Sequence, residues 1–163
     1  MGVEIERKFL LRGDAWRAQA GERTRMVQGY LGGESCSVRV RIEGGAAFLN
    51  IKSREAGPRR IEFEYPLPLA DAEFMLQRFC PQQVEKWRHR IEAGPHVWEI
   101  DEFLGDNAGL VVAEIELGAE DEPFARPDWL GAEVTDETRY YNLNLAAMPY
   151  SRWPDRDALA SGE

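Results

Sequence analysis

Charged and apolar residues alternate along most of this chain, and that period of two strongly constrains what it can fold into. Successive side chains of a β-strand point to opposite faces, so residues two apart share a face. The first such segment, Val3–Arg12, puts Glu4, Glu6 and Lys8 on one face and apolar side chains on the other. A chain that repeats this pattern is expected to form a sheet with one ionised face and one apolar face.

The same alternation predicts eight strands separated by turn residues. They are Val3–Arg12, Arg25–Leu31, Ser37–Glu43, Ala47–Ser53, Arg59–Leu67, Val84–Ala93, Val97–Phe103 and Leu110–Leu117. Gly44-Gly45 and Gly94-Pro95 indicate the turns of two hairpins. Eight antiparallel strands are enough to close a barrel. The predicted fold is therefore α+β: an eight-stranded antiparallel β-barrel with a few peripheral helices.

Three short helices are expected outside the barrel or at its ends. They are Asp14–Ala20 with Asp14 as N-cap, Asp71–Cys80 ended by a proline, and a segment from about Thr138 to Met148. The length of 163 residues fits one domain. We expect residues 1–150 to form the barrel domain and residues 151–163 a loosely held tail.

The ionised face is unusual because its charges sort by sign from strand to strand. The groups are Glu4/Glu6 with Lys8, Arg39/Arg41, Asn50/Lys52, Glu62/Glu64, Lys86/Arg88/Arg90, Glu99/Asp101 and Glu114/Glu116. A strand with one solvated face also alternates, but its polar positions usually mix hydroxyls, amides and single charges. Like charges side by side repel, so these groups predict bound ligands that neutralise them.

Two kinds of ligand match the two kinds of group. Lysine and arginine side chains that converge on one cavity can neutralise a polyphosphate, and guanidinium groups bind phosphate oxygens bidentately. Paired carboxylates supply the hard oxygen ligands that suit Mg²⁺ or Mn²⁺ held together with a substrate phosphate. The face therefore predicts a tunnel for a metal-bound polyphosphate, and it leaves the substrate open.

Overall charge and composition narrow the partners further. The formal charge of −9 argues against binding to nucleic acid or to an anionic membrane. No stretch approaches the length of a membrane span, and no secretory signal is evident, so we expect a cytoplasmic protein. Cys36 and Cys80 are expected to be free thiols. The oligomeric state is left open, a homodimer included.

The chain resembles a known family in the order and spacing of these residues. Glu4-Ile5-Glu6-Arg7-Lys8 matches the ExExK signature of the CYTH domain, also called the triphosphate tunnel metalloenzymes. The resemblance continues through Gln28-Gly29-Tyr30-Leu31, Arg39-x-Arg41, Lys52, Glu62-x-Glu64, Lys86-x-Arg88, Asp101, Glu114-x-Glu116 and Arg139-Tyr140-Tyr141-Asn142. It covers residues 3 to about 148 and is closest to short, single-domain bacterial members.

The resemblance implies site roles. Substrate phosphates would be held by Lys8, Arg39, Arg41, Lys52, Lys86 and Arg88. Metal ions, expected to be two Mg²⁺ or Mn²⁺, would be held by Glu4, Glu6, Glu62, Glu64, Asp101, Glu114 and Glu116. Our first assignment places one ion on Glu114 and Glu116 with Glu4 or Glu6, and Asp101 near a second ion or the attacking water. Catalytic roles are expected for Glu4, Glu6, Asp101 and Lys86.

The activity implied is hydrolysis of a short triphosphate, first of all inorganic tripolyphosphate to pyrophosphate and phosphate. Thiamine triphosphatase or adenylyl cyclase chemistry in the same tunnel, and a non-catalytic polyphosphate- or nucleotide-binding module, are the alternatives. The chain departs from its relatives at Tyr141, where they typically have lysine. This departure leaves open which length of substrate the site prefers, and Arg139 or Arg90 are candidates to replace the charge of the lysine.

Some smaller features have an ordinary interpretation. Tyr30 either contacts the ligand or packs at a strand end, and the second reading is at least as good. His89 falls on the apolar side of its strand and is expected to be packed there. Arg59 and Arg60 are expected in solvent or at a strand edge.

Overall fold

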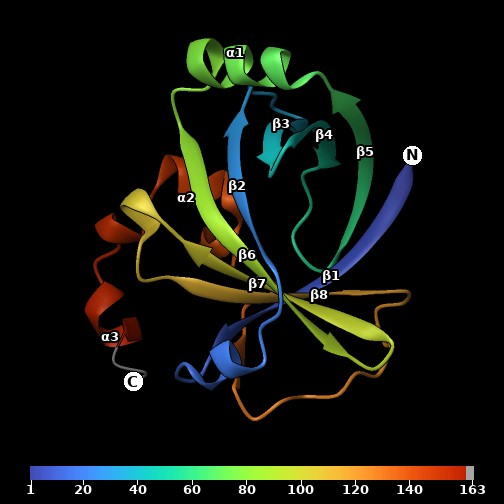
Figure 1. The fold of residues 1–163 in the computed structure, drawn as a ribbon, viewed down its shortest axis with the longest axis vertical. Helices are drawn as coiled ribbons and strands as arrows, with labels where there is room; N and C mark the ends of the chain where they lie inside the picture. The colour runs from blue at the N-terminus through green and yellow to red at the C-terminus, as the bar shows by residue number, and fades with distance from the viewer. Residues whose placement is uncertain (161–163) are drawn as a thin grey trace.

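Eight antiparallel strands close into a barrel in the computed structural model, which describes residues 1–160 (Figure 1). Around the barrel the order is β1-β5-β4-β3-β2-β6-β7-β8, and β8 pairs with β1. The strands are β1 Gly2–Leu11, β2 Arg23–Tyr30, β3 Cys36–Glu43, β4 Ala46–Ser53, β5 Arg59–Leu67, β6 Gln83–Ala93, β7 His96–Phe103 and β8 Val111–Leu117. The predicted barrel is confirmed, and each predicted strand overlaps an observed one.

The barrel closes at β1, which pairs along its length with three strands. Its first residues pair with β5, its middle with β8, and its last residues with a short additional strand, β9 Leu130–Glu133. The sequence did not predict β9, because four residues with no alternation carry no strand signal. Its pairing depends on a close approach to β1: a Cβ on Gly131 would lie 2.8 Å from the carbonyl oxygen of Leu10.

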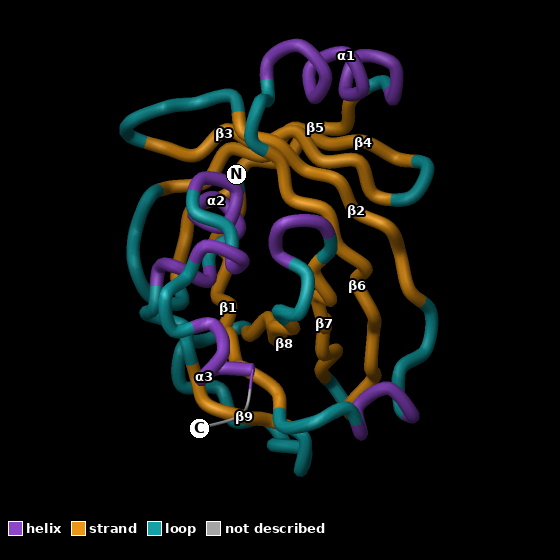
Figure 2. The backbone as a smooth tube through the Cα atoms, turned by 90° about the vertical axis from the view of Figure 1, so that its left-hand side faces the viewer, coloured by secondary structure: helices purple, strands orange, loops and turns teal. Residues whose placement is uncertain are grey.

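Three α-helices and several short 3₁₀ turns surround the barrel. The helices are α1 Leu69–Phe79, α2 Asn142–Ala147 and α3 Arg156–Ala160, and the 3₁₀ turns are Ala15–Ala18, Gly105–Asn107, Thr138–Tyr140 and Tyr150–Arg152. Figures 1 and 2 show α1 at one end of the barrel and the C-terminal helices beside its wall.

Two helix predictions need correction. The expected helix Asp14–Ala20 is a single 3₁₀ turn, and the Asp14 side chain makes no capping hydrogen bond. The helix expected from Thr138 to Met148 is interrupted at Tyr141, whose backbone is extended at φ −70° and ψ 138°. The Tyr141 hydroxyl donates to the carbonyl oxygen of Thr135, and this contact across the turn favours the break.

Much of the apolar core lies outside the barrel wall rather than inside it. The outward faces of β1, β6, β7 and β8 pack under the 3₁₀ turn Ala15–Ala18 and the segment that carries Trp129. A second apolar layer joins α1 to β3 and β4 through Leu76 and Val40. Because these layers supply the burial that stabilises the fold, the interior of the barrel is free to hold charged side chains.

One end of the interior is apolar and filled. The inward rows that carry the charges continue into Val84, Phe103 and Val112, and the C-terminal segment packs onto these residues through Leu145 and Trp153. The predicted division into residues 1–150 and a loosely held tail stays a prediction. Within that tail the Trp153 side chain is buried, and residues 161–163 lie outside the described part.

Candidate active site

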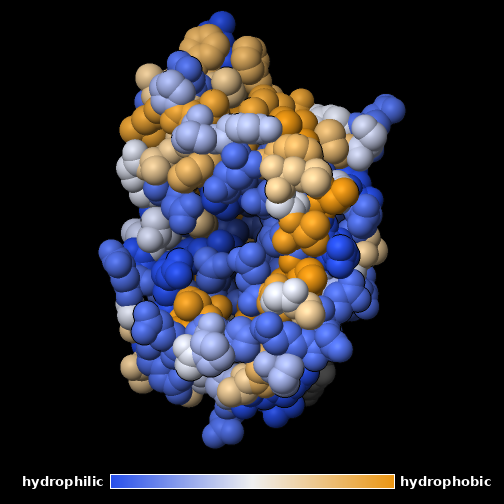
Figure 3. All heavy atoms as spheres, turned by 90° about the vertical axis from the view of Figure 1, so that its right-hand side faces the viewer, coloured by the Kyte–Doolittle hydropathy of each residue, from blue (hydrophilic) through white to orange (hydrophobic). Residues whose placement is uncertain are grey.

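A charged cavity of about 680 Å³ occupies the interior beyond this apolar end. Figure 3 shows a hollow lined by hydrophilic residues on one face of the molecule. All residues predicted for the site line the cavity except Asp101. The lining residues among them are Glu4, Glu6, Lys8, Arg39, Arg41, Lys52, Glu62, Glu64, Lys86, Arg88, Glu114 and Glu116. The alternation along each strand thus correctly predicted that residues more than a hundred positions apart in the sequence share one cavity.

The two arginines of β3 line one wall, where Arg41 Nη2 contacts Glu43 at 3.2 Å and Glu64 at 3.3 Å. Within the described chain, the Nε atoms of Arg39 and Arg41 are buried without a hydrogen-bond partner. Burial and the neighbouring Arg39 lower the pKa of Arg41. Buried cationic donors without partners are costly, so this wall is suited to an anion that accepts from them.

Lys52 lies where this basic wall meets the acidic one. Its Nζ atom is 2.9 Å from Glu4 Oε2 and 3.1 Å from Glu62 Oε2. Burial and Arg39 act to lower the pKa of Lys52, but the nearby carboxylates outweigh them and raise it. Burial acts to raise the pKa of Glu4, and Lys52 lowers it to about 2. Both groups are therefore charged at neutral pH.

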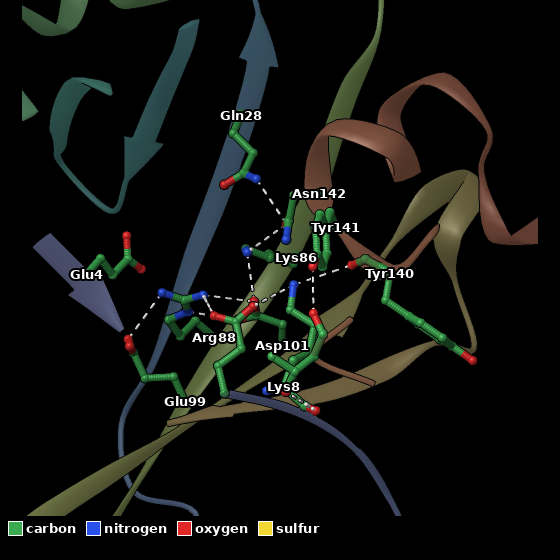
Figure 4. A network of polar contacts seen from close by, with 12 residues as sticks. Glu4, Lys8, Gln28, Lys86, Arg88, Glu99, Asp101, Tyr140, Tyr141 and Asn142 are labelled. Atoms are coloured by element: carbon green, nitrogen blue, oxygen red, sulfur yellow. Dashed lines mark hydrogen bonds and ion pairs between the residues drawn. The ribbon is translucent and has the colours of Figure 1, made fainter. Parts of the chain in front are cut away.

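A compact ion network lies at the inner end of the cavity (Figure 4). Asp101 accepts from Lys86 Nζ at 2.7 Å and from Arg88 Nε at 2.7 Å and Nη2 at 2.8 Å. Arg88 also reaches Glu99 and Glu114, each at 3.1 Å. Burial lowers the pKa of Lys86 to about 8, with Asp101 opposing the shift. Asp101 is fully buried beneath the two cations, so its carboxylate faces them and not the cavity.

The C-terminal segment is tied to this network through Asn142, the first residue of α2. Its Oδ1 atom accepts from Lys86 Nζ at 2.9 Å and from Gln28 Nε2 at 2.9 Å (Figure 4). Gln28 is fully buried on β2. A single amide oxygen thus joins the start of α2 to side chains of the adjacent strands β2 and β6 and fixes the position of the Lys86 ammonium.

The remaining carboxylates repel one another. Burial, then Glu114 and Glu4, raise the pKa of Glu6 well above its ordinary value. Burial, then Glu4 and Glu99, also raise the pKa of Glu116. A divalent cation in this space would relieve that repulsion, and carboxylate oxygens are the ligands it prefers.

The donor set therefore fits a divalent cation, with one condition. In residues 1–160 no three carboxylate, histidine or cysteine side chains are arranged to enclose an ion by themselves. Several of the carboxylates instead contact basic side chains, as Glu114 contacts Lys8 at 3.3 Å. Such a site would need ligands from the substrate as well, which is how Mg²⁺ is commonly held beside phosphates.

Sequence reasoning missed some residues of the cavity and placed others correctly outside it. Arg60 lines the cavity, although it was expected in solvent or at a strand edge. Its position two residues before Glu62 on β5 was the signal that could have found it. Neither Arg139 nor Arg90 lines the cavity: Arg139 binds Asp155 and Arg90 is largely exposed.

Two further residues have the surroundings that their strand positions suggested. Tyr30 lies in the cavity lining, and its hydroxyl accepts a hydrogen bond from Gln28 at 3.3 Å. His89 is packed on the outside of the wall as expected, with its ring edge-on to Trp16 at 4.9 Å and its Nε2 3.2 Å from Glu102.

Comparison with known proteins finds one family over nearly the whole chain. The model of the CYTH domain matches residues 2–147. An inorganic triphosphatase of Acetivibrio thermocellus is 42% identical over 157 residues, which cover 95% of this chain and 100% of the relative. An inorganic triphosphatase of Nitrosomonas europaea is 34% identical over 152 residues, covering 88% and 97%. A solved structure of an inorganic triphosphatase superposes with a TM-score of 0.64 at 32% identity, covering 90% of this chain and 95% of that one.

Proposed function

The chain belongs to the CYTH domain family, and on this premise we propose that it hydrolyses inorganic tripolyphosphate to pyrophosphate and phosphate with a divalent cation. The relatives named inorganic triphosphatase support the reaction, since they match this chain over nearly its whole length. The observation that carries the proposal is the cavity itself: unpartnered guanidinium donors on one wall face a crowded set of carboxylates on another.

The basic residues bind the substrate in this proposal. Arg39 and Arg41 line the cavity, and among residues 1–160 their Nε atoms have no hydrogen-bond partner. Lys8, Lys52 and Arg88 bring further positive charge to the lining. Tripolyphosphate carries several negative charges, and a set of fixed cations stabilises both the bound substrate and the charge that develops as a phosphoryl group transfers.

In this proposal the carboxylates bind the cation and accept the proton of the attacking water. A bound divalent cation would neutralise phosphate oxygens and polarise the phosphoryl group under attack. Glu114 and Glu116, with Glu4 or Glu6, are proposed to hold one ion, and the other of Glu4 and Glu6 to orient the water and take its proton. The water oxygen forms a bond to a terminal phosphorus, the bridging P–O bond breaks, and its electron pair leaves with pyrophosphate. We propose that two ions bind and that each is Mg²⁺ or Mn²⁺.

Asp101 has a different role in this proposal. Because both its oxygens are taken by Lys86 and Arg88, it holds two cations charged and oriented rather than binding metal or substrate. Lys86 then faces the departing pyrophosphate with its ammonium fixed by Asp101 and Asn142.

One product assay separates this function from its alternatives. The purified protein is incubated with Mg²⁺ or Mn²⁺ and with tripolyphosphate, thiamine triphosphate or ATP, and phosphate, pyrophosphate and cyclic AMP are measured. We expect equimolar phosphate and pyrophosphate from tripolyphosphate, abolished by chelation and by Glu4→Gln. Glu73→Gln, exposed on α1, is the matched control and should retain full activity.

Other outcomes would contradict the proposal. Faster cleavage of thiamine triphosphate would reassign the substrate, and cyclic AMP with pyrophosphate would reassign the reaction. Tight binding of tripolyphosphate without product would favour a binding module.

We also propose a cytoplasmic location, supported by two cysteines that are free thiols. Within residues 1–160, the helices are all too short or too polar to cross a membrane. Fractionation of cells with a tagged chain tests the location.

A further inference from the structure

Arg60 is a basic residue of the cavity that none of the expected site roles includes. It lies on the inward face of β5, two residues before Glu62, and its register partner across the β1–β5 pair is Glu4. The side chain lines the cavity and is partly buried. Its position is therefore that of a site residue rather than of a solvated strand edge.

Arg60 differs from several other cations of the cavity in its ion pairs. Among residues 1–160, no carboxylate oxygen lies within ion-pair distance of its guanidinium, whereas Lys8, Lys52 and Arg88 each contact at least one. Its Nη2 atom is buried and, in the same described part, makes no hydrogen bond. A buried cationic donor without an anion is unfavourable, so this geometry is suited to an anion from outside the chain.

Tyr141 holds the Arg60 guanidinium at this position. Its ring centroid lies 4.6 Å from Arg60 Cζ, the geometry of a cation–π contact. The Tyr141 hydroxyl donates to the Thr135 carbonyl at 2.5 Å and accepts from the Gly57 N–H at 3.2 Å, so the ring is anchored at its far end. Lys8 also lies beside the ring, with Nζ 5.2 Å from the centroid, and Figure 4 shows Lys8 and Tyr141 together.

This arrangement explains how a tyrosine can occupy a position where a lysine was expected. Tyr141 brings no charge of its own, but its ring contacts two cations that come from different strands of the barrel. The positive charge beside the ring therefore comes from Lys8 on β1 and Arg60 on β5 rather than from Tyr141 itself.

We propose that Arg60 is a substrate-binding residue that contacts a terminal phosphate of the polyphosphate, and that Tyr141 is the positioning residue that orients its guanidinium. The planar guanidinium can bind two phosphate oxygens at once, and stacking on the ring reduces the rotamer freedom lost on binding. The identity of the ligand as a polyphosphate rests on the proposed function, but its binding to Arg60 does not require turnover.

The test is calorimetric binding of tripolyphosphate without metal, with Arg60→Gln compared with Arg59→Gln. Arg59 is the adjacent, exposed arginine and serves as the matched control. We expect Arg60→Gln to weaken binding about tenfold or more, because a charge-assisted hydrogen bond is lost. Arg60→Lys, which keeps the charge, should fall between, and Arg59→Gln should bind like the wild type. Melting temperatures check that each variant is folded.

Kinetics and a double-mutant cycle test the two roles separately. With Mg²⁺, Arg60→Gln should raise KM for tripolyphosphate and change kcat little, since the phosphate contact exists before and during the reaction. Tyr141→Leu should weaken binding several-fold, and Tyr141→Phe, which keeps the ring, should weaken it less. The double variant of Arg60→Gln with Tyr141→Leu should bind no more weakly than Arg60→Gln alone.

Each result decides between the proposals. Wild-type affinity in Arg60→Gln would overturn the role of Arg60 even if the protein hydrolyses tripolyphosphate. Additive effects in the double variant would overturn the positioning role of Tyr141. Tight wild-type binding without hydrolysis would refute the proposed reaction and leave the role of Arg60 standing, whereas no binding by the wild type would refute both.

Discussion

Replacement of Asp101 by asparagine isolates the electrostatic centre of the cavity, because asparagine keeps the shape and removes the charge. Asp101 is fully buried and neutralises Lys86 and Arg88 through three contacts of 2.7, 2.7 and 2.8 Å. Its removal takes away the carboxylate that pairs with Lys86, whereas Arg88 still contacts Glu99 and Glu114. Glu114 is already 3.3 Å from Lys8, so it compensates only in part.

The size of the effect follows from the two cations. Breaking a buried ion pair costs about 3–5 kcal/mol when the remaining charge is uncompensated. Lys86 can limit its share by losing its proton, since its pKa is already lowered to about 8, but Arg88 stays charged. We therefore expect Asp101→Asn to lose roughly 3–5 kcal/mol at pH 7, which lowers the melting temperature by roughly 6–20 °C in a domain of this size.

Thermal unfolding and urea titration of the metal-free protein measure this loss, with exposed Asp121→Asn as the control. The additional change Lys86→Met should recover part of the stability, because it removes the cation that Asp101 paired. A loss below about 1 kcal/mol in Asp101→Asn would refute the reasoning, since it is the size expected for an exposed pair. An unchanged metal-free stability with loss of stabilisation by Mg²⁺ would instead identify Asp101 as a metal ligand.

Three further predictions follow from particular contacts. Because the pKa of Lys86 is lowered to about 8, metal-free binding of tripolyphosphate should weaken as the pH rises above that value and should be accompanied by proton uptake. Calorimetry in buffers of different ionisation enthalpy measures the uptake, and an unaltered pH dependence of binding in Lys86→Arg would contradict the prediction. Glu6→Gln should abolish turnover yet raise the metal-free melting temperature at pH 7, because the raised pKa of Glu6 means that folding disfavours its charge. The gain should vanish below the ordinary pKa of 4.5, where the group is protonated in both states, and a lowered melting temperature at pH 7 would refute the repulsion. Gly29→Ala places a Cβ 2.5 Å from Cys80 Cβ and should destabilise the protein by about 1–3 kcal/mol, as measured by urea titration. Adding Cys80→Gly should recover part of the loss, and equal stability of Gly29→Ala and the wild type would show that α1 can move away from β2.

Strand parity predicted most of the site because it depends only on local backbone geometry. Glu4 and Glu116 lie far apart in the sequence, yet each was assigned to the inward face of its own strand, and closure of the barrel then placed both in one cavity. The same argument should have included Arg60, which shares the face of Glu62. It was overlooked because an adjacent pair of arginines has the appearance of a solvated edge.

Strand parity predicts the face on which a side chain lies, but it does not predict how deep inside the barrel that side chain lies. Asp101 was assigned to the correct face, but it lies beneath Lys86 and Arg88 and does not line the cavity. Its depth depends on the register of β7 against β6, where Asp101 is the partner of Arg88. Register is set by all neighbouring strands together, so no single segment predicts which charges meet the ligand and which meet each other.

The alternation of charged and apolar residues by itself determined the barrel, its inward ionised face and the division into cations and carboxylates. The tertiary structure decided what closes the barrel and where its unpaired charge remains. The break at Tyr141 arises from a hydrogen bond to Thr135, and the stacking of its ring on Arg60 joins the C-terminal segment to β5. Such contacts join segments distant in sequence, and their geometry exists only once the strands have closed.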